Sequence, residues 1–173
     1  MLSIKRTPFK GSEQTVSDII KKALAAQDNF SVRQIVEDIC RDLRSKDYLS
    51  EMLAVYHFVL ANTRYMRDPK TVELVKNPVF TVGEIRNGKI PQLDCDDLTV
   101  LLAAMLLSLG CGIRIATVAF KHAFYAGQRQ YSHVFVQAYE PRSKTWITLD
   151  PVAGEKTKTM MSRAVAVKIY NVI

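Results

Sequence analysis

Apolar side chains recur every three or four residues through the first third of the chain, which is the spacing of one buried helix face. This pattern predicts three helices, over residues 16–24, 32–43 and 49–63. Ser31, followed three residues later by Gln34, predicts a capping box at the start of the second helix.

Residues 66–94 interrupt this pattern with three prolines and two glycines. The third helix should end before Pro69, because the residue before a proline disfavours the helical conformation. We expect the rest of this stretch to be a long irregular connection, with a short extended piece at 79–82. Long ordered connections in compact domains are often functional.

The second half of the chain begins with a segment that is apolar on nearly every side. Residues 98–109 form this segment, and Gly110, a favoured residue just after a helix, follows it. This predicts a central, buried helix. Stretches rich in β-branched and apolar residues then predict four strands, at 113–120, 131–139, 145–149 and 165–172.

Helices followed by consecutive strands indicate an α+β fold, with N-terminal helices and a central buried helix packed on a mainly antiparallel sheet. The chain has 173 residues, of which 48% are hydrophobic, and this is the usual size of one domain. We therefore expect a single domain over 1–173. It would consist of a helical N-terminal extension at 1–48 and a core at 49–155.

The formal charge of +7 permits weak binding to polyanions but does not indicate a nucleic-acid protein. The basic residues are scattered and form no recognised nucleic-acid-binding motif, so no specific nucleic-acid partner is expected. The longest apolar run, 100–107, is far shorter than the ~20 residues that span a bilayer, so no membrane partner is expected. An odd number of cysteines, three, and no apolar leader in residues 1–10 favour a cytoplasmic protein without disulfides.

Cys95 stands out because acidic residues surround it at the start of the buried helix. Asp94 is the predicted N-cap and Asp97 the capping-box acid, which places Cys95 in the first turn. The partial positive charge and free N–H groups of a helix N-terminus stabilise a thiolate and can stabilise an oxyanion. Asp96 and Asp97 oppose ionisation of the thiol, so a nearby imidazolium would be needed. For Cys40 and Cys111 we expect buried, inert thiols.

His133 lies in a predicted strand, whereas His57 and His122 lie in a helix and a loop. The residues from Glu140 to Lys144 predict a turn before the next strand. A two-residue turn would place His133 directly opposite Asp150, on the same face of the sheet. An aspartate in that position can orient the imidazole and stabilise its charged form.

These motifs together resemble the transglutaminase-like superfamily of papain-like thiol enzymes, including its small bacterial and prophage members. The matching pieces span about 50–155 and are Asn62 to Pro69, Asp94-Cys95-Asp96-Asp97, Leu109-Gly110, Ser132 to Val136, and Trp146 to Pro151. The resemblance implies a papain-like fold and a Cys95–His133–Asp150 triad that performs acyl transfer or hydrolysis at amide bonds. Many members have glycine where this chain has Leu93, so the resemblance does not identify the groups that would donate hydrogen bonds to the oxyanion. Gln92 and Tyr65 are candidates beside the Cys95 N–H.

We therefore expect a thiol-dependent acyl-transfer enzyme that needs no metal and no cofactor. Its substrate would be a protein or peptide amide. Transfer to water would make it a cysteine protease or amidase, and transfer to a lysine amine would make it a transglutaminase. The alternative is a non-catalytic binding or phage-assembly module on the same fold, although such a module has no need of all three residues. The resemblance to prophage members also leaves a phage-encoded cytoplasmic protein open, and the oligomeric state stays open.

Overall fold

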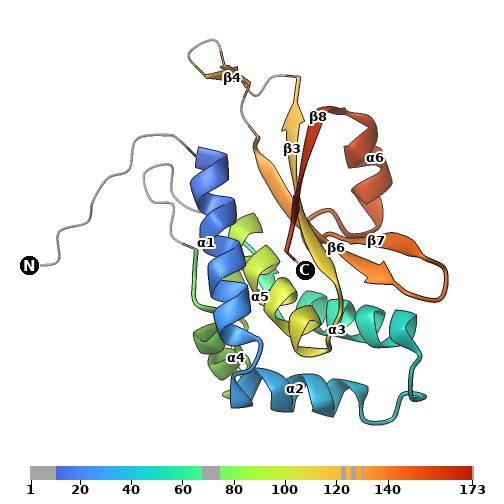
Figure 1. The fold of residues 1–173 in the computed structure, drawn as a ribbon. Coiled ribbons are helices and arrows are strands. Elements are labelled where there is room, and N and C mark those ends of the chain that lie inside the picture. Colours follow the sequence, from blue (N-terminus) through green and yellow to red (C-terminus); the bar gives the residue numbers. More distant parts are fainter. Residues whose placement is uncertain (1–10, 68–74, 122–123, 126–127, 130, 173) are drawn as a thin grey trace, which may run out of the picture.

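A four-stranded antiparallel sheet forms one layer of the structure, and helices cover the face that carries most of its core side chains (Figure 1). The computed structural model describes residues 11–67, 75–121, 124–125, 128–129 and 131–172. The helices are α1 (Gly11–Ala26), α2 (Phe30–Cys40), α3 (Tyr48–Asn62), α4 (Pro78–Arg86), α5 (Cys95–Ser108) and α6 (Thr157–Ser162), with a 3₁₀ turn η1 (Gly154–Lys156). The strands are β1 (Arg64–Tyr65), β2 (Gln92–Leu93), β3 (Ile113–Phe120), β4 (Phe124–Tyr125), β5 (Gln128–Arg129), β6 (His133–Glu140), β7 (Thr145–Leu149) and β8 (Ala164–Asn171).

The main sheet has the strand order β7-β6-β3-β8, and every neighbouring pair in it is antiparallel. Along β3, Ile113 and Ile115 join the large core that includes α5, whereas Ala116 and Val118 form a smaller cluster with Phe135. Partly buried methionines of α6 pack on this second cluster. This alternation is the two-residue period of a strand with both faces covered. The α+β fold with a mainly antiparallel sheet is thus confirmed.

Helix α5 is the central element of the core, as the sequence predicts. All its residues from Asp97 to Leu107 are buried, which is why its apolar pattern has no polar side. Helices α1, α2, α3 and α4 all contact α5. Ile19 of α1 and Val32 of α2 are fully buried in the same core. The N-terminal helices therefore pack as part of the central core.

The prediction of an irregular connection over 66–94 is wrong, because this stretch contains helix α4. Asn77 caps this helix by accepting the Val79 N–H at 3.0 Å, and Pro78 occupies the first turn. Both are start signals for a helix. The β-branched residues at 79–82 indicated an extended segment, but tertiary packing overrides that preference. Residues 68–74 lie outside the described residues.

Two further boundaries differ from expectation. Helix α2 is capped by Asn29, whose side chain accepts the Ser31 N–H, and not by Ser31 itself. Strand β8 lies beyond the expected core at 49–155, yet it pairs with β3 over most of its length. On β8, Val165, Val167 and Ile169 are exposed, and among the described residues this strand pairs with β3 alone.

The β6–β7 hairpin has a four-residue loop, so the expected two-residue turn is wrong. Glu140 pairs with Thr145, and its carboxylate accepts the N–H groups of Arg142 at 2.9 Å and Ser143 at 2.6 Å. Lys144 takes a left-handed conformation with φ of 54°. The side chain of Glu140 thus organises a wider turn than the local sequence indicates.

Candidate active site

Cys95 is the first residue of α5, and the chain on both sides of it is held firmly. The Asp94 carboxylate accepts the N–H groups of Asp96 and Asp97, each at 3.0 Å, which confirms Asp94 as the N-cap. Leu93, which stands where glycine was expected from the resemblance, is 1% exposed in the core. It also pairs with Tyr65 in the parallel β1–β2 ladder. The strand before Cys95 and the Asp94 cap, which binds the two N–H groups after it, fix the position of the cysteine.

His133 and Asp150 form a buried pair. The His133 Nε2 lies 2.7 Å from the Asp150 Oδ2, and the two side chains are 10% and 0% exposed. The other carboxylate oxygen, Oδ1, accepts the N–H groups of Val152 at 3.0 Å and Ala153 at 3.1 Å. Because a carboxylate only accepts, the Nε2 carries the proton, and the Nδ1 of a neutral imidazole is left as a base.

His133 and Asp150 lie on the same face of the sheet although the predicted turn is wrong, because the hairpin register differs from the expected one by two residues. The loop is two residues longer than expected, so the position opposite Asp150 becomes that of Phe135, next to the last pair, Val136 with Leu149. His133 lies two residues from Phe135, and residues two apart share a face of the sheet. A one-residue difference would have separated His133 and Asp150 onto opposite faces.

The first turn of α5 lies along the edge of β6 at the point where β7 no longer pairs with it. Tyr139 donates its N–H to Gly112 on the β3 side. The backbone groups of Val134, five residues away, therefore point to the opposite edge. There the Val134 N–H donates to the Cys95 sulfur, and the Thr99 hydroxyl donates to the Val134 carbonyl at 3.1 Å. Pro151, just beyond β7, has no N–H to continue the ladder.

This arrangement brings the Cys95 sulfur next to the peptide group that follows His133. Cys95 and Thr99 lie one helical turn apart and together satisfy both backbone groups of Val134. The sulfur therefore lies at the edge of the sheet, at the first strand residue after the histidine. The structure thus brings His133 and Asp150 together at the end of β7, and it places Cys95 of α5 beside Val134, the residue after His133.

The thiol of Cys95 is held in its neutral form. Burial raises its pKa first, and the Asp96 and Asp94 carboxylates raise it further. The S–H donates to the Asp96 Oδ1 at 3.4 Å, whereas the Val134 N–H lowers the pKa. The sequence names Asp97 as the second opposing acid. In the structure Asp94 has that effect, and Asp97 does not serve as a capping-box acid, because its carboxylate binds Lys76.

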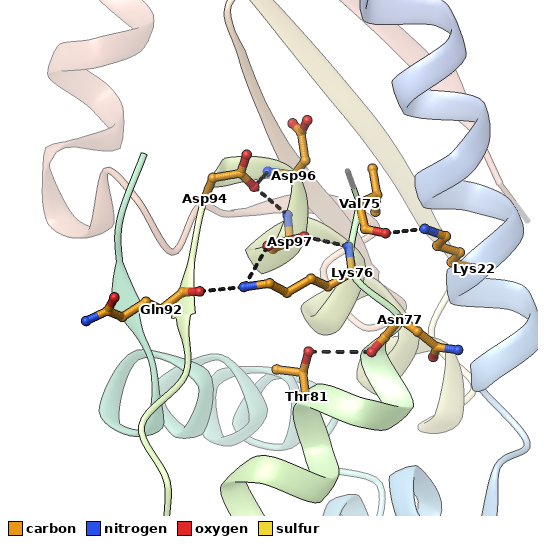
Figure 2. Close-up of polar contacts among 9 residues, drawn as sticks. All are labelled: Lys22, Val75, Lys76, Asn77, Thr81, Gln92, Asp94, Asp96 and Asp97. Atoms are coloured by element: carbon orange, nitrogen blue, oxygen red, sulfur yellow. Dashed lines mark hydrogen bonds and ion pairs between the residues drawn. The ribbon is translucent and has the colours of Figure 1, made fainter. Parts of the chain in front are cut away.

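The two oxyanion candidates lie on the short strands that precede Cys95. Gln92 is exposed on β2, and its carbonyl accepts the Lys76 ammonium at 2.7 Å. Figure 2 shows its side chain pointing away from Lys76. Tyr65, on β1, is 48% exposed. Their role as oxyanion donors stays a prediction.

Tyr56 is a site residue that the sequence does not reveal. Its hydroxyl donates to the Asp150 carbonyl at 3.0 Å and so joins α3 to the end of β7. In the sequence Tyr56 belongs to the apolar face of a helix, and no local pattern predicts a hydroxyl partner 94 residues away. Such a contact depends on the tertiary fold alone.

The other cysteines and histidines have different surroundings. Burial raises the pKa of the Cys111 thiol to about 12, with smaller effects of Glu51 and Cys40, and burial also raises the pKa of Cys40. His57 is exposed on α3, and His122 lies outside the described residues. Among the residues described, no three His, Cys, Asp or Glu side chains are grouped so as to hold a metal ion. Within the same part of the chain, every helix is too short or too polar to cross a bilayer.

Comparison with known proteins gives matches among solved structures only. No family model and no curated protein matches the chain. A structure from Cytophaga hutchinsonii, provisionally described as a cysteine protease, matches with a TM-score of 0.54 at 14% identity, covering 98% of this chain and 55% of that one. A structure from Parabacteroides distasonis, provisionally described as a protease, matches with a TM-score of 0.57 at 12% identity, covering 88% and 32%. The chain spans about half the length of the first and a third of the second. Its mixed architecture of helices and an antiparallel sheet is similar to theirs, which is consistent with a papain-like fold.

Proposed function

We propose that this chain is a thiol-dependent acyl-transfer enzyme that acts on amide bonds through Cys95, His133 and Asp150. The observation that carries the proposal is the buried contact of 2.7 Å between His133 and Asp150, beside the peptide group that binds the Cys95 sulfur. A nucleophile, a base and a group that orients the base are the parts that covalent catalysis requires. The provisional description of both similar structures as proteases supports the same class.

In the proposed reaction His133 acts as a general base, because the resting Cys95 is a thiol. As the sulfur attacks the amide carbonyl, its proton moves to the His133 Nδ1, and a carbon–sulfur bond forms. The tetrahedral intermediate then breaks its carbon–nitrogen bond, and His133 returns the proton to the leaving amine. Asp150 holds the Nε2–H and stabilises the imidazolium between the two steps. The product is a thioester on Cys95.

The Asp94 cap binds the N–H groups of Asp96 and Asp97, which leaves the Cys95 N–H at the start of α5 for the developing oxyanion. The Cys95 N–H is the first candidate, and Gln92 and Tyr65 remain further ones. An acceptor then attacks the thioester. Water gives a carboxylic acid, as in a protease or amidase, whereas a lysine amine gives a cross-link, as in a transglutaminase.

The experiment is to incubate the protein with casein and a degenerate peptide library, with and without a biotinylated alkylamine. Mass spectrometry would record cleaved amides, incorporated amine and any acyl adduct on Cys95. Cys95→Ala should abolish all three signals. His133→Ala should slow product formation by about 10²–10⁴-fold, the usual contribution of a general base. Cys40→Ala and the exposed His57→Ala are the matched controls and should keep the wild-type rate.

Two results would decide against the proposal. A folded protein that yields no product and no adduct would favour the non-catalytic binding module. Activity that persists in Cys95→Ala would place the chemistry elsewhere.

A further inference from the structure

The segment Val75–Asn77 is held by four separate elements close to the start of α5 (Figure 2). The Lys22 ammonium of α1 donates to the Val75 carbonyl. Asn77 caps α4. Between them, Lys76 contacts both α5 and β2. A short segment outside the proposed triad thus connects α1, α4, β2 and α5.

Lys76 binds the chain on both sides of Cys95. Its backbone N–H donates to the Asp97 Oδ1 at 2.6 Å, and its ammonium lies 3.5 Å from the Asp97 Oδ2. The same ammonium donates to the Gln92 carbonyl at 2.7 Å. Gln92 precedes Cys95 by three residues, and Asp97 follows it by two. One lysine side chain therefore joins the strand that leads into the nucleophile to the helix turn that leaves it.

The Asp97 carboxylate is an unusual group to find there, because Asp97 is 2% exposed in the first turn of the buried helix α5. Within the described part of the chain its Oδ2 has no hydrogen bond, and the Lys76 ammonium is its ion-pair partner. Burial raises the pKa of Asp97, although the N–H and ammonium of Lys76 lower it. A buried carboxylate is weak support for stability, since desolvation of the charge offsets the attraction to its partner. Asp97 thus calls for a role other than stability.

We propose that the Asp97–Lys76 pair is a positioning device that holds the Cys95 turn in register with His133. The proposal deepens the proposed function and rests on it for its meaning in catalysis. Without the pair, the turn would be held by the Asp94 cap, by the Thr99 bond to Val134 and by the β1–β2 pairing that precedes it. Asp97 and Lys76 are positioning residues, because they act through the backbone of Gln92 and of α5.

The test compares Lys76→Met, Lys76→Arg and Asp97→Asn with wild type. Lys76→Met removes both ammonium contacts, and Asp97→Asn removes the ion pair but keeps the shape of the side chain. Lys168→Met is the matched control, because its ammonium also forms an ion pair and its side chain has a similar exposure, 42% against 45% for Lys76. Hydrogen exchange of the amides at 93–98 and product formation in the acyl-transfer assay are the readouts.

Lys76→Met should speed exchange of these amides by about tenfold, as expected for the loss of a charged hydrogen bond. Asp97→Asn should speed it less and should not lower the melting temperature. Lys76→Arg and Lys168→Met should exchange as wild type does. Product formation should fall in Lys76→Met and recover in Lys76→Arg.

Each contrary outcome has its own meaning. Unchanged amide exchange in Lys76→Met would overturn the positioning device whatever the activity. Faster exchange with unchanged product formation would overturn its role in positioning Cys95. If Lys76→Met exchanges faster and the wild-type protein itself forms no product, the proposed function is overturned and the positioning device is supported.

Discussion

At the scale of single residues, the Cys95 thiol lies between two groups with opposite effects. Its S–H donates to the Asp96 carboxylate at 3.4 Å, which favours the protonated form. On the other side the Val134 N–H donates to the sulfur, which favours the thiolate. Burial adds to the effect of Asp96, so the neutral thiol prevails. In the proposed reaction Cys95 therefore starts as a thiol, and His133 would take its proton as the sulfur attacks.

Asp96→Asn should lower the pKa of Cys95 and speed its alkylation near neutral pH. Removal of one adjacent negative charge shifts a pKa by about 1 unit or more, so the rate below the pKa should rise about tenfold. Wild-type Cys95 should alkylate appreciably only as the pH rises above 9.0, the ordinary thiol value from which its pKa is raised. The measurement is iodoacetamide labelling from pH 6 to 11, with peptide mapping to separate the three cysteines. Asp38→Asn is the control, because Asp38 is exposed on α2. Coincident pH curves for Asp96→Asn and wild type would show that the carboxylate does not act on the thiol.

At the scale of elements, α5 supplies hydrogen-bond partners to the edge of β6 at the point where β7 ends. Val134 of β6 receives its two backbone partners from Cys95 and Thr99, which belong to one turn of a helix. The Thr99 side chain is fully buried, so its hydroxyl bond to the Val134 carbonyl is shielded from water. This contact fixes the distance of the helix from the strand, and with it the place of the Cys95 sulfur.

Thr99→Val keeps the shape of the side chain but leaves the Val134 carbonyl without its donor. A buried group left unsatisfied costs about 1–3 kcal/mol, so the free energy of unfolding should fall by that amount. Thr99→Ser keeps the donor and loses one methyl group, which costs about 0.8 kcal/mol. Urea unfolding measures both. A larger loss in Thr99→Ser than in Thr99→Val would mean that packing of the methyl group, and not the hydrogen bond, matters at this position.

The elements that could be predicted are those whose signals are local. Asp94 caps α5 because capping depends on residues one turn apart, and the four main strands follow from β-branched, apolar runs. The α4 helix was missed because its start signal, Asn77-Pro78, competes with a β-branched interior. The hairpin register was wrong because the Glu140 side chain, and not the backbone sequence alone, sets the turn. Long-range partners such as Tyr56 and Lys76 have no local signal at all.

At the scale of the whole molecule, α1 belongs to the same core as the proposed catalytic helix. The segment at 1–48 was expected to be an extension, yet α1 packs directly on α5. The core cluster runs without interruption from α1 through α5 to β3 and β6. The helices and the sheet should therefore unfold together.

Ile19→Ala should lower the free energy of unfolding by about 2–5 kcal/mol, the range for a large aliphatic side chain removed from a core. Trp146, the single tryptophan, lies on β7 away from α1, so its fluorescence reports on the sheet. One transition in urea, shifted to lower concentration in the variant, would show that loss of an α1 contact reaches β7. Phe30→Ala is the control, because Phe30 is 76% exposed, and it should change stability by no more than about 0.5 kcal/mol. An unshifted fluorescence transition in Ile19→Ala would show that α1 unfolds independently.

Among the described residues no strand pairs with the outer edge of β8, so the sheet can be extended on the side farther from His133 and Asp150. Strand β3 separates β8 from β6, so a strand added beside β8 would lengthen the sheet without touching His133 or Asp150. Val165, Val167 and Ile169 already present the apolar side chains that such a neighbour would cover. A strand added at this edge would therefore leave the contact between His133 and Asp150 unchanged.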